Sequence, residues 1–489
     1  MSENAGESGH TSRFAIDVRS DLPDLRSLAG VSERQPEELT TAVYFDTPDL
    51  RLWARGITLS RRPGPALQWT LTLPGPASEQ ATGSDALHWA GDEQMPAGVM
   101  RVVAGVVRRA GLAPVAELRT ERIRFVLRDN GVPWAELAND VVTIVGGRAD
   151  AERFRRLELH VDGTVPAGDR RVGALVKALR RAGARPQARP DLAEVVGPRP
   201  APPAPVATSS AEEMVVFALS DTLGRLLDAD VRIRSAVADI DAEDIHRARV
   251  ATRRLRADLK TLRSILDPVW VDHVRADLRW LGAALGEVRD ADVLAARLHD
   301  AGASPTVVRV IGRERSGAVE RLLTALGERR YLDLLDRLHA ASLLPPVADR
   351  HRARRAARKV LPPLADQCWK KVRSDVRHVS KRPADTQLHR VRKRSKQLRY
   401  ASELAVPVVG GPARRTAKAA ASLQTVLGSL NDAVVVTEWL ERAGRDQGEL
   451  APGEVATLIR AEQERRRQLR RHWRSSYRRL ARSHSRAWL

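Results

Sequence analysis

The residues best suited to chemistry in this chain are a histidine and three basic residues at helical spacing, an arrangement that occurs twice. The first copy is His246, Arg249, Arg253 and Arg256, and the second is His389, Arg392, Lys396 and Arg399. The shared positions i, i+3, i+7 and i+10 lie along one stripe of an α-helix, where a bundle helix normally carries apolar side chains. Because unpaired buried charge is very unfavourable, such a stripe requires water or a polyanion beside it.

Neighbouring residues extend the two stripes unequally. Lys260 continues the first stripe, whereas Glu403 occupies the matching position after the second. Tyr400 follows the second stripe, either as a hydrogen-bond donor to a phosphate oxygen or as a packing residue. We expect the two stripes to form facing basic walls that bind a phosphate chain. The alternative is a charged helix face exposed to solvent.

The two histidines raise two other hypotheses, a metal site and a general base. The next stripe positions after His246 and His389 are basic, so the carboxylates that accompany a metal site are missing there. A histidine among guanidinium groups should have a lowered pKa and could act as a neutral hydrogen-bond donor. Asp290 and Asp432 are interpreted as helix N-caps or arginine partners rather than as catalytic acids.

The net charge of the chain is unevenly distributed. The 489 residues carry a formal net charge of +21, yet the first 200 contain 27 basic and 26 acidic residues, whereas the remainder contains 55 and 35. Most basic residues are arginine, whose planar guanidinium binds phosphate oxygens in pairs. GC-rich coding also favours arginine over lysine, but it does not explain the uneven excess. The second part should therefore attract nucleic acid, an anionic membrane surface or inorganic polyphosphate.

Cysteine content and apolar runs predict a cytoplasmic protein. Cys368 is the only cysteine, so no disulfide can form within the chain, as expected for a reducing compartment. The polar N-terminus lacks the pattern of a signal peptide. No apolar run approaches the roughly 18 residues of a membrane span. We therefore expect no membrane association.

The first part of the chain is typical of short β-strands. Residues 1–11 are predicted to be disordered and residues 12–195 to form one domain. Alternating apolar and polar residues predict one antiparallel sheet, closed or nearly closed, with strands at Phe14–Val18, Thr41–Phe45, Ile57–Arg61, Leu67–Leu73, Arg122–Arg128, Val141–Val145 and Phe154–Val161. Asn130-Gly131 predicts a tight hairpin, and a helix is expected at Arg171–Ala182.

A proline-rich linker at residues 196–210 precedes a helical domain at residues 211–489. Leu285-Gly286 with Asp290 recurs as Leu427-Gly428 with Asp432, and the basic stripe recurs at nearly the same separation in residue number. Two motifs repeated in the same order indicate an internal duplication. The repeats are predicted at about 211–345 and 346–489. The predicted fold class is α+β with two domains, the second being all-α and built from two pseudo-symmetric bundles.

The helical part resembles the CHAD family, named for a conserved-histidine α-helical domain. Four motifs carry the resemblance, in the order His246-x-x-Arg-Val-Ala-Thr-Arg-Arg-Leu-Arg256, Leu285-Gly-x-x-Arg-Asp-x-Asp292, His389-x-x-Arg-x-x-x-Lys-x-Leu-Arg-Tyr400 and Leu427-Gly-x-x-Asn-Asp432. The resemblance implies two pseudo-symmetric four-helix bundles that bind inorganic polyphosphate in a basic central cavity, with no cofactor required. It implies phosphate-binding roles for His246, Arg249, Arg253, Arg256, His389, Arg392, Lys396 and Arg399. Further candidates for polyphosphate binding are Lys260, Arg289 and Tyr400.

The first part resembles the CYTH, or triphosphate tunnel, family of adenylate cyclases, thiamine triphosphatases and inorganic triphosphatases. The resemblance runs from about Phe14 to Ala184. It rests on the stretch from Val43-Tyr-Phe-Asp-Thr-Pro-Asp-Leu-Arg51 to Arg62, followed by Trp69-x-Leu-x-Leu-Pro74. It implies an antiparallel β-barrel with a central tunnel. CYTH and CHAD domains are often joined in one chain, so the two resemblances support each other.

Several acidic positions of the tunnel family are missing here. In that family carboxylates hold Mg²⁺ or Mn²⁺ while basic residues bind the phosphates. The first-strand motif Glu-x-Glu-x-Lys corresponds to Ala15, Asp17 and Arg19, and Asn139 stands at another acidic position. The acidic residues that remain as metal candidates are Asp17, Glu136, Asp140 and Glu158. The candidate phosphate contacts of the tunnel are Arg19, Arg61, Arg62, Arg119 and Arg122.

Three functions compete. The leading hypothesis is a non-enzymatic polyphosphate-binding protein with an inactive or weakened tunnel, and the resemblance also suggests polyphosphate granules as a location. The second is a triphosphatase acting on triphosphate or nucleotides, which would require Mg²⁺ or Mn²⁺. The third is a protein that binds nucleic acid non-specifically through charge. Aromatic residues that could stack on bases are sparse among the basic motifs, which argues against the third.

Overall fold

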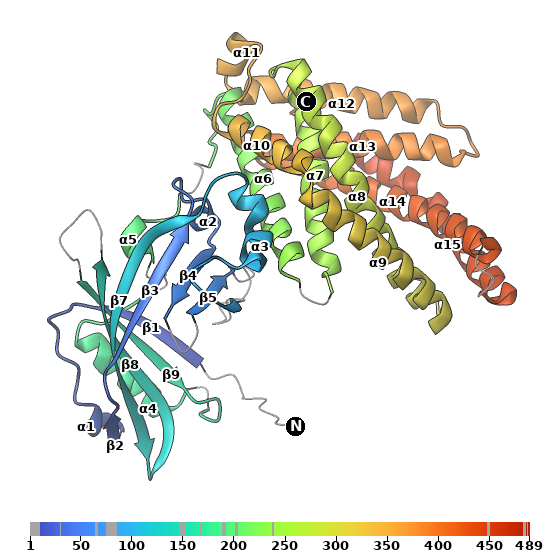
Figure 1. The fold of residues 1–489 in the computed structure, drawn as a ribbon. Coiled ribbons are helices and arrows are strands. Elements are labelled where there is room, and N and C mark those ends of the chain that lie inside the picture. Colours follow the sequence, from blue (N-terminus) through green and yellow to red (C-terminus); the bar gives the residue numbers. More distant parts are fainter. Residues whose placement is uncertain are drawn as a thin grey trace. The chain divides into compact units, whose positions relative to one another are not determined.

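The computed structural model describes residues 10–29, 31–63, 67–74, 86–145, 153–166, 168–187, 192–200, 204–236, 239–446, 450–482, 486 and 488–489. The chain divides into two compact units, residues 1–201 and 202–489 (Figure 1). The predicted disorder of residues 1–9 lies outside the described residues. His10 and Thr11, which were also expected to be disordered, begin the first strand.

The first unit contains one ten-stranded antiparallel sheet. Its strands are β1 (His10–Ile16), β2 (Val31–Arg34), β3 (Glu38–Asp46), β4 (Thr58–Arg62), β5 (Leu67–Thr72), β6 (Ala86–Gly91), β7 (Ala113–Asp129), β8 (Val132–Val145), β9 (Arg153–Val161) and β10 (Arg185–Pro186). The order is β10-β1-β9-β8-β7-β3-β4-β5-β6, with β2 paired to β7. The predicted antiparallel sheet is confirmed. Among the described residues its end strands, β6 and β10, are not hydrogen-bonded to each other.

Strands β7 and β8 form the longest hairpin of the sheet. Asn130 and Gly131 connect them with φ values of 49° and 82°. Such a turn requires positive φ at both central positions, which asparagine and glycine tolerate best. The predicted tight hairpin is therefore confirmed, and it sets the register that pairs Arg122 with Asp140 across the two strands.

One face of the sheet carries a large apolar cluster of this unit, while a smaller cluster with Leu118, Val142 and Ile144 lies on the other face. The first unit also contains helices α1 (Leu25–Ala29), α2 (Arg51–Ala54), α3 (Ala97–Val107), α4 (Arg170–Arg181) and α5 (Leu192–Val196). Leu137 and Leu157 of the sheet pack in one buried cluster with Leu175 and Leu179 of α4. Because side chains alternate along a strand, the residues between these leucines lie on the opposite face. The helix predicted at 171–182 is confirmed by α4.

The second unit is entirely helical in its described residues, apart from two isolated bridges. Its helices are α6 (Ala211–Ser235), α7 (Ala242–Leu262), α8 (Pro268–Asp300), α9 (Pro305–Gly327), α10 (Arg329–Leu343), α11 (Arg350–Arg354), α12 (Ala357–Arg377), α13 (Asp385–Val409), α14 (Gly411–Asp446) and α15 (Pro452–Ala481). Ser210 and Glu213 form a capping box that fixes the start of α6 directly after the proline-rich segment.

The helical unit repeats one arrangement of four helices. Helices α6 to α9 are followed in the same order by α12 to α15, while α10 and α11 connect the two sets (Figure 1). The two repeated motifs place α13 in the role of α7 and α14 in that of α8. One buried cluster joins α12, α13, α14 and α15, and another joins α8 and α9 to α14 and α15. The two repeats therefore share part of their core.

Helix α14 contains a long apolar stretch. By length and composition, its residues Gly411–Arg445 meet the criterion for a membrane span, which no other described helix does. Several of its apolar side chains pack against neighbouring helices instead, among them Leu423, Leu427 and Trp439. This segment was not expected from the sequence, because charged residues interrupt its apolar runs.

Candidate functional site

The two basic stripes lie on helices that contact each other. Arg253 on α7 donates from Nη2 to the Tyr400 hydroxyl on α13 at 3.0 Å. Gln397 on α13 donates from Nε2 to Thr261 Oγ1 on α7 at 2.8 Å. Arg254 also pairs with Glu403. Because rising numbers on α7 meet falling numbers on α13, the two helices run antiparallel where they touch.

The contacts between α7 and α13 follow the internal repeat. When His246 is matched to His389, Arg254 matches Gln397, and Lys260 matches Glu403. Arg254 reaches Glu403, and Gln397 reaches Thr261, the residue next to Lys260. Nearly the same pair of positions therefore forms a contact on both sides of a pseudo-two-fold axis. The contact is an ion pair on one side and an amide hydrogen bond on the other.

Cations of both stripes crowd around Lys396. Burial and the nearby charges of Arg253 and Arg392 lower the pKa of Lys396 from its usual 10.5 to about 7. Burial also lowers the pKa of Arg392, although Asp432 acts in the opposite direction. The pKa of His246 is lowered by burial and then by the charge of Arg289. The expected lowering of a histidine pKa among guanidinium groups is confirmed at His246.

Two guanidinium groups in this cluster have unsatisfied hydrogen-bond donors. The Nε atoms of Arg253 and Arg392 are buried and have no hydrogen-bond partner in the described residues. A buried donor without a partner costs about 1–3 kcal/mol. An anion with several acceptor oxygens beside this cluster would offset the repulsion between the cations.

Carboxylates and amides hold the outer members of the cluster. Arg249 donates from Nη1 to Asp290 Oδ1 at 2.7 Å, and His389 Nδ1 lies 2.7 Å from Asn431 Oδ1. Because that oxygen can only accept, Nδ1 donates and Nε2 remains available to a ligand. Asp290 lies inside α8 and Asp432 inside α14. The N-cap interpretation is therefore wrong for both, and the arginine-partner interpretation is confirmed for Asp290.

The remaining predicted residues continue the same surface. Arg399 donates to Glu403 Oε1 at 2.7 Å, and its guanidinium lies 5.8 Å from the centre of the Tyr400 ring. Tyr400 is buried, so its ring packs while its hydroxyl accepts from Arg253. Arg256 is half-buried and Lys260 is exposed.

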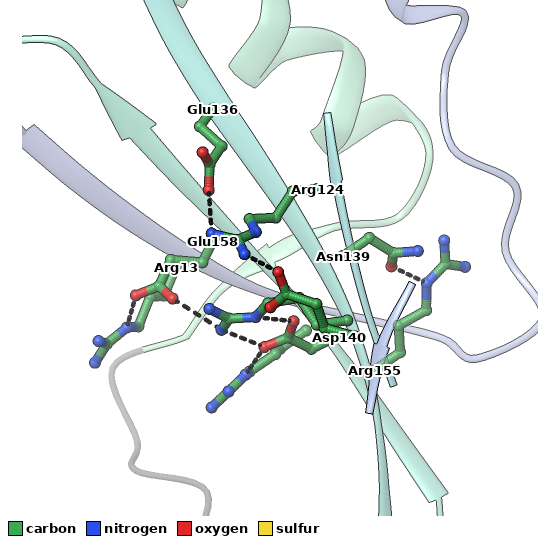
Figure 2. Close-up of polar contacts among 10 residues, drawn as sticks. Arg13, Arg124, Glu136, Asn139, Asp140, Arg155 and Glu158 are labelled. Carbon is green, nitrogen blue, oxygen red and sulfur yellow. Dashed lines mark hydrogen bonds and ion pairs between the residues drawn. The ribbon is translucent and has the colours of Figure 1, made fainter. Parts of the chain in front are cut away.

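Arginine–carboxylate pairs occupy the polar face of the sheet in the first unit (Figure 2). Arg122 binds both oxygens of Asp140 at 2.8 Å, and Arg156 adds a third contact to Asp140 at 2.7 Å. Glu158 is held by Arg13 at 2.9 Å and lies 3.5 Å from Arg122. The face therefore carries an ion-pair network that spans β1, β7, β8 and β9.

Asp140 is the buried centre of this network. Its side chain is fully buried. Burial acts to raise the pKa of Asp140, but the hydrogen bond from Arg122 and the charge of Arg156 outweigh it, so the pKa lies below its usual value. Asp140 is consequently ionised at neutral pH, with both oxygens engaged by arginine. The described residues contain no group of three or more histidine, cysteine or acidic side chains that could hold a metal ion.

The other residues predicted for the tunnel do not join this network. Strand β1 ends at Ile16, so the predicted strand Phe14–Val18 is wrong at its end, and Asp17 and Arg19 lie in the turn that follows. There the Asp17 carboxylate accepts from the Arg19 backbone. Arg61 stacks on Phe45 and Trp69, each 5.6 Å away. Arg62 and Arg119 are exposed. Glu136 is 4.0 Å from Arg124.

Sequence reasoning missed two arginines of the first unit. Arg13 pairs with Glu158 across β1 and β9, and Arg155 donates from Nε to Asn139 Oδ1 at 2.7 Å. The alternation of Phe14 and Ile16 could have placed Arg13 on the polar face. Asn139 lies on the apolar side of β8, next to Asp140 in sequence but on the opposite face.

Comparison with known proteins identifies both a domain and relatives of the whole chain. A model of the CHAD domain matches residues 217–441, which confirms the resemblance for the helical unit. Two uncharacterized proteins of Mycobacterium tuberculosis, MT2285 (strain CDC 1551 / Oshkosh) and Rv2226 (strain ATCC 25618 / H37Rv), are each 32% identical over 469 residues. The match covers 88% of this chain and 87% of each relative.

Solved structures resemble each unit in turn. The CHAD domain from the plant Ricinus communis shares 23% identity, covering 57% of this chain and 95% of that chain, with a TM-score of 0.47. A protein of Bacillus halodurans described as a candidate adenylate cyclase shares 13% identity, covering 39% of this chain and 98% of that chain, with a TM-score of 0.27.

Proposed function

We propose that this chain, which belongs to the family of the Mycobacterium tuberculosis protein Rv2226 and carries a CHAD domain, binds inorganic polyphosphate along the two basic stripes. The observation that carries the proposal is the cation cluster around Lys396. The pKa of Lys396 is about 7, and the guanidinium groups of Arg253 and Arg392 each have an unsatisfied donor. The site is therefore electrostatically incomplete without an anion.

The arrangement of the stripes favours a thin, flexible polyanion. Helices α7 and α13 lie close enough for Arg253 of α7 to contact Tyr400 of α13. A phosphate chain offers acceptor oxygens along its whole length and can meet cations of both helices at once. Duplex nucleic acid is a rigid rod whose phosphates lie on its outside, so it would contact only the exposed cations. Selectivity for polyphosphate over DNA follows from this difference.

The first unit is proposed to act without metal catalysis. Mg²⁺ and Mn²⁺ require several free oxygen ligands, whereas both oxygens of Asp140 and one of Glu158 accept from arginines at 2.9 Å or less. The residues present do not fit a divalent cation. We infer that this polar face is a scaffold or a binding surface.

Titration of the purified protein with long-chain polyphosphate, with duplex DNA as competitor, tests the main proposal. The double variant Arg253→Gln/Lys396→Gln should bind at least roughly ten-fold more weakly, because it loses charge-assisted contacts. The matched control is Arg414→Gln/Lys418→Gln, which removes the same charges from exposed positions on α14. Equal losses in both variants, or displacement of polyphosphate by equimolar DNA phosphate, would reduce the stripes to a generic anion surface.

Phosphate release from tripolyphosphate and ATP, with Mg²⁺ or Mn²⁺ present, tests the proposal for the first unit. We expect release no faster than from the Asp140→Asn variant. Metal-dependent hydrolysis that this variant abolishes would contradict the scaffold proposal and favour the triphosphatase alternative.

A further inference from the structure

One face of α8 carries a line of residues that sequence reasoning used only in part. Arg275, Arg279, Gly282, Gly286 and Arg289 follow one another at spacings of four, three, four and three residues, so they lie on one face of the helix. From its first arginine to its last, the line is roughly 21 Å long at about 1.5 Å per residue. Three arginines thus flank two glycines.

This line of α8 lies against the first basic stripe. The Gly286 carbonyl is 3.5 Å from Arg249 Nη1. A Cβ atom built on Gly282 would lie 3.7 Å from Arg256 Nη1. Two stripe arginines of α7 therefore rest over the glycines of α8, where no side chain separates them from the helix.

The matching line on α14 is different. When Gly286 is matched to Gly428, the five equivalent positions are Ala417, Ala421, Gln424, Gly428 and Asn431. Gly428 lies beside an arginine of the second stripe, just as Gly282 lies beside an arginine of the first. A Cβ atom built on Gly428 would lie 3.9 Å from Arg392 Nε. None of the five positions on α14 carries a charge. The duplicated scaffold is thus cationic along one copy of this helix face and neutral along the other.

Arg275 and Arg279 belong electrostatically to the end of the first stripe. Burial lowers the pKa of Arg256, and the charges of Arg279 and Arg275 lower it further. Although Lys260 reaches solvent, partial desolvation lowers its pKa, with the charges of Arg275, Arg394 and Lys371 acting in the same direction. The Nε atom of Arg275 is buried with no hydrogen-bond partner among the described residues.

The acid that pairs with Arg275 does not neutralise this group of cations. Asp272 lies 3.7 Å from Arg275, but its shorter contact, at 2.7 Å, is with Arg263. One carboxylate is therefore shared by two arginines, and the cations at this end of α8 retain a positive excess. They reproduce the condition found around Lys396, with a buried unsatisfied guanidinium donor among like charges.

We propose that Arg275 and Arg279 form an additional anion subsite that extends the polyphosphate path along α8, beyond the two stripes, toward Lys260, Arg394 and Lys371. The inference rests on the proposed polyphosphate function. It also specifies the ligand, namely phosphate chains long enough to occupy the stripes and α8 together. A short phosphate chain would occupy only the cluster around Lys396. Because the matching face of α14 carries no charge, the path is extended along α8 only.

Calorimetric titration with tripolyphosphate and with long-chain polyphosphate, each at several salt concentrations, tests the subsite. For Arg275→Gln/Arg279→Gln in the full-length protein, we expect a loss of roughly ten-fold or more in affinity for the long chain. The slope of log affinity against log salt should shrink by roughly 1 to 2, the value for two lost phosphate contacts. Tripolyphosphate affinity should stay within two-fold of the parent.

Two further variants make the outcome interpretable. Arg275→Lys/Arg279→Lys should retain most of the salt slope, and Arg414→Gln/Arg415→Gln on the exposed face of α14 serves as the charge-matched control. The subsite is overturned if the α8 variant behaves like this control, or if it loses affinity equally for short and long chains. A parent protein that binds neither chain would instead refute the proposed function itself.

Discussion

At Lys396, the proposed binding of polyphosphate should be linked to the binding of a proton. Its pKa is lowered to about 7 by burial and by the charges of Arg253 and Arg392. A bound polyanion would stabilise the ammonium form and raise this pKa toward its usual 10.5. Above pH 7 the free protein has lost this proton, so binding must take one up.

Polyphosphate affinity should therefore fall as the pH rises from 7 to about 10, by up to ten-fold per pH unit for one coupled proton. Calorimetry in buffers of different ionisation enthalpy measures the proton uptake directly. Lys396→Arg should flatten the dependence, because arginine remains charged in this range. Proton uptake that is equal in the parent and in Lys396→Arg would exclude Lys396 as the titrating group.

The same residue should weaken the unliganded fold. A lysine whose folded pKa is depressed destabilises the native state at low pH, and stability rises as the pH increases from about 7 toward 10.5. Lys396→Met removes the repelled charge and keeps the length of the side chain. We expect a Tm at pH 6 that is higher by roughly 2–4 °C, measured by calorimetry, together with weaker polyphosphate binding. A lower Tm would show that the lysine stabilises the cluster.

Single residues also show what sequence alone could predict of the site. The two stripes could be recognised in the sequence because basic residues follow His246 and His389 at the same spacing. Arg275 and Arg279 were not identified, because the matching positions on α14, Ala417 and Ala421, are uncharged and so no repeat marks the two arginines. Arg13 was missed because β1 was predicted to start at Phe14, four residues too late, so Arg13 lay outside the predicted strand.

At the scale of elements, the contact between α7 and α13 depends on Glu403. This carboxylate accepts from Arg254 and, at 2.7 Å, from Arg399. At the matching position the first repeat has Lys260, so Glu403 is the one acidic residue among the extended stripe positions. It stabilises the helix pair and reduces the positive charge offered to a ligand.

Glu403→Gln should separate these two effects. The loss of a charged partner for two arginines should destabilise the helical unit by roughly 2 kcal/mol. It should also strengthen polyphosphate binding by roughly five-fold, since one nearby negative charge is removed. Glu441→Gln, at an exposed position of α14, is the matched control. Denaturant unfolding and polyphosphate titration give the two numbers, and a change in the same direction for both would contradict the assignment.

The elements themselves were predicted unevenly. Strands with clear alternation, such as β5 and β9, were identified, and so was the β7–β8 hairpin through Asn130-Gly131. The short strands β2 and β10 consist of four and two residues, too few for a period to be visible. Strands β7 and β8 were recognised only in part, because consecutive polar residues interrupt the alternation along each strand, at Arg119-Thr120-Glu121 in β7 and at Asn139-Asp140 in β8.

At the scale of the whole molecule, the two units have separate cores and separate proposed roles. Anything that binds only the native state of one unit stabilises that unit by mass action. Polyphosphate at one hundred times its Kd should add about 2.7 kcal/mol to the helical unit and leave the β unit unchanged. Differential scanning calorimetry should then show two transitions, of which one moves. A common shift of both would indicate that the units unfold together.

The division into two units was visible in the sequence as the change from alternating to helical patterns around the proline-rich segment. The internal duplication of the second unit was also visible, since two motifs recur in the same order at nearly equal separations. The sequence did not indicate that α8 and α9 share a core with α14 and α15. Such a contact joins positions far apart in the chain and leaves no local period.

The ion pairs of Asp140 have a consequence for how this protein can change. A divalent cation could gain Asp140 as a ligand only after Arg122 or Arg156 has been lost. Losing either arginine leaves the buried carboxylate with the other one, so the first loss weakens the ion-pair network without freeing Asp140 completely. A new carboxylate introduced first would be paired by the same arginines. A metal site at Asp140 would therefore require two kinds of substitution together, the loss of an arginine and the gain of further carboxylate ligands.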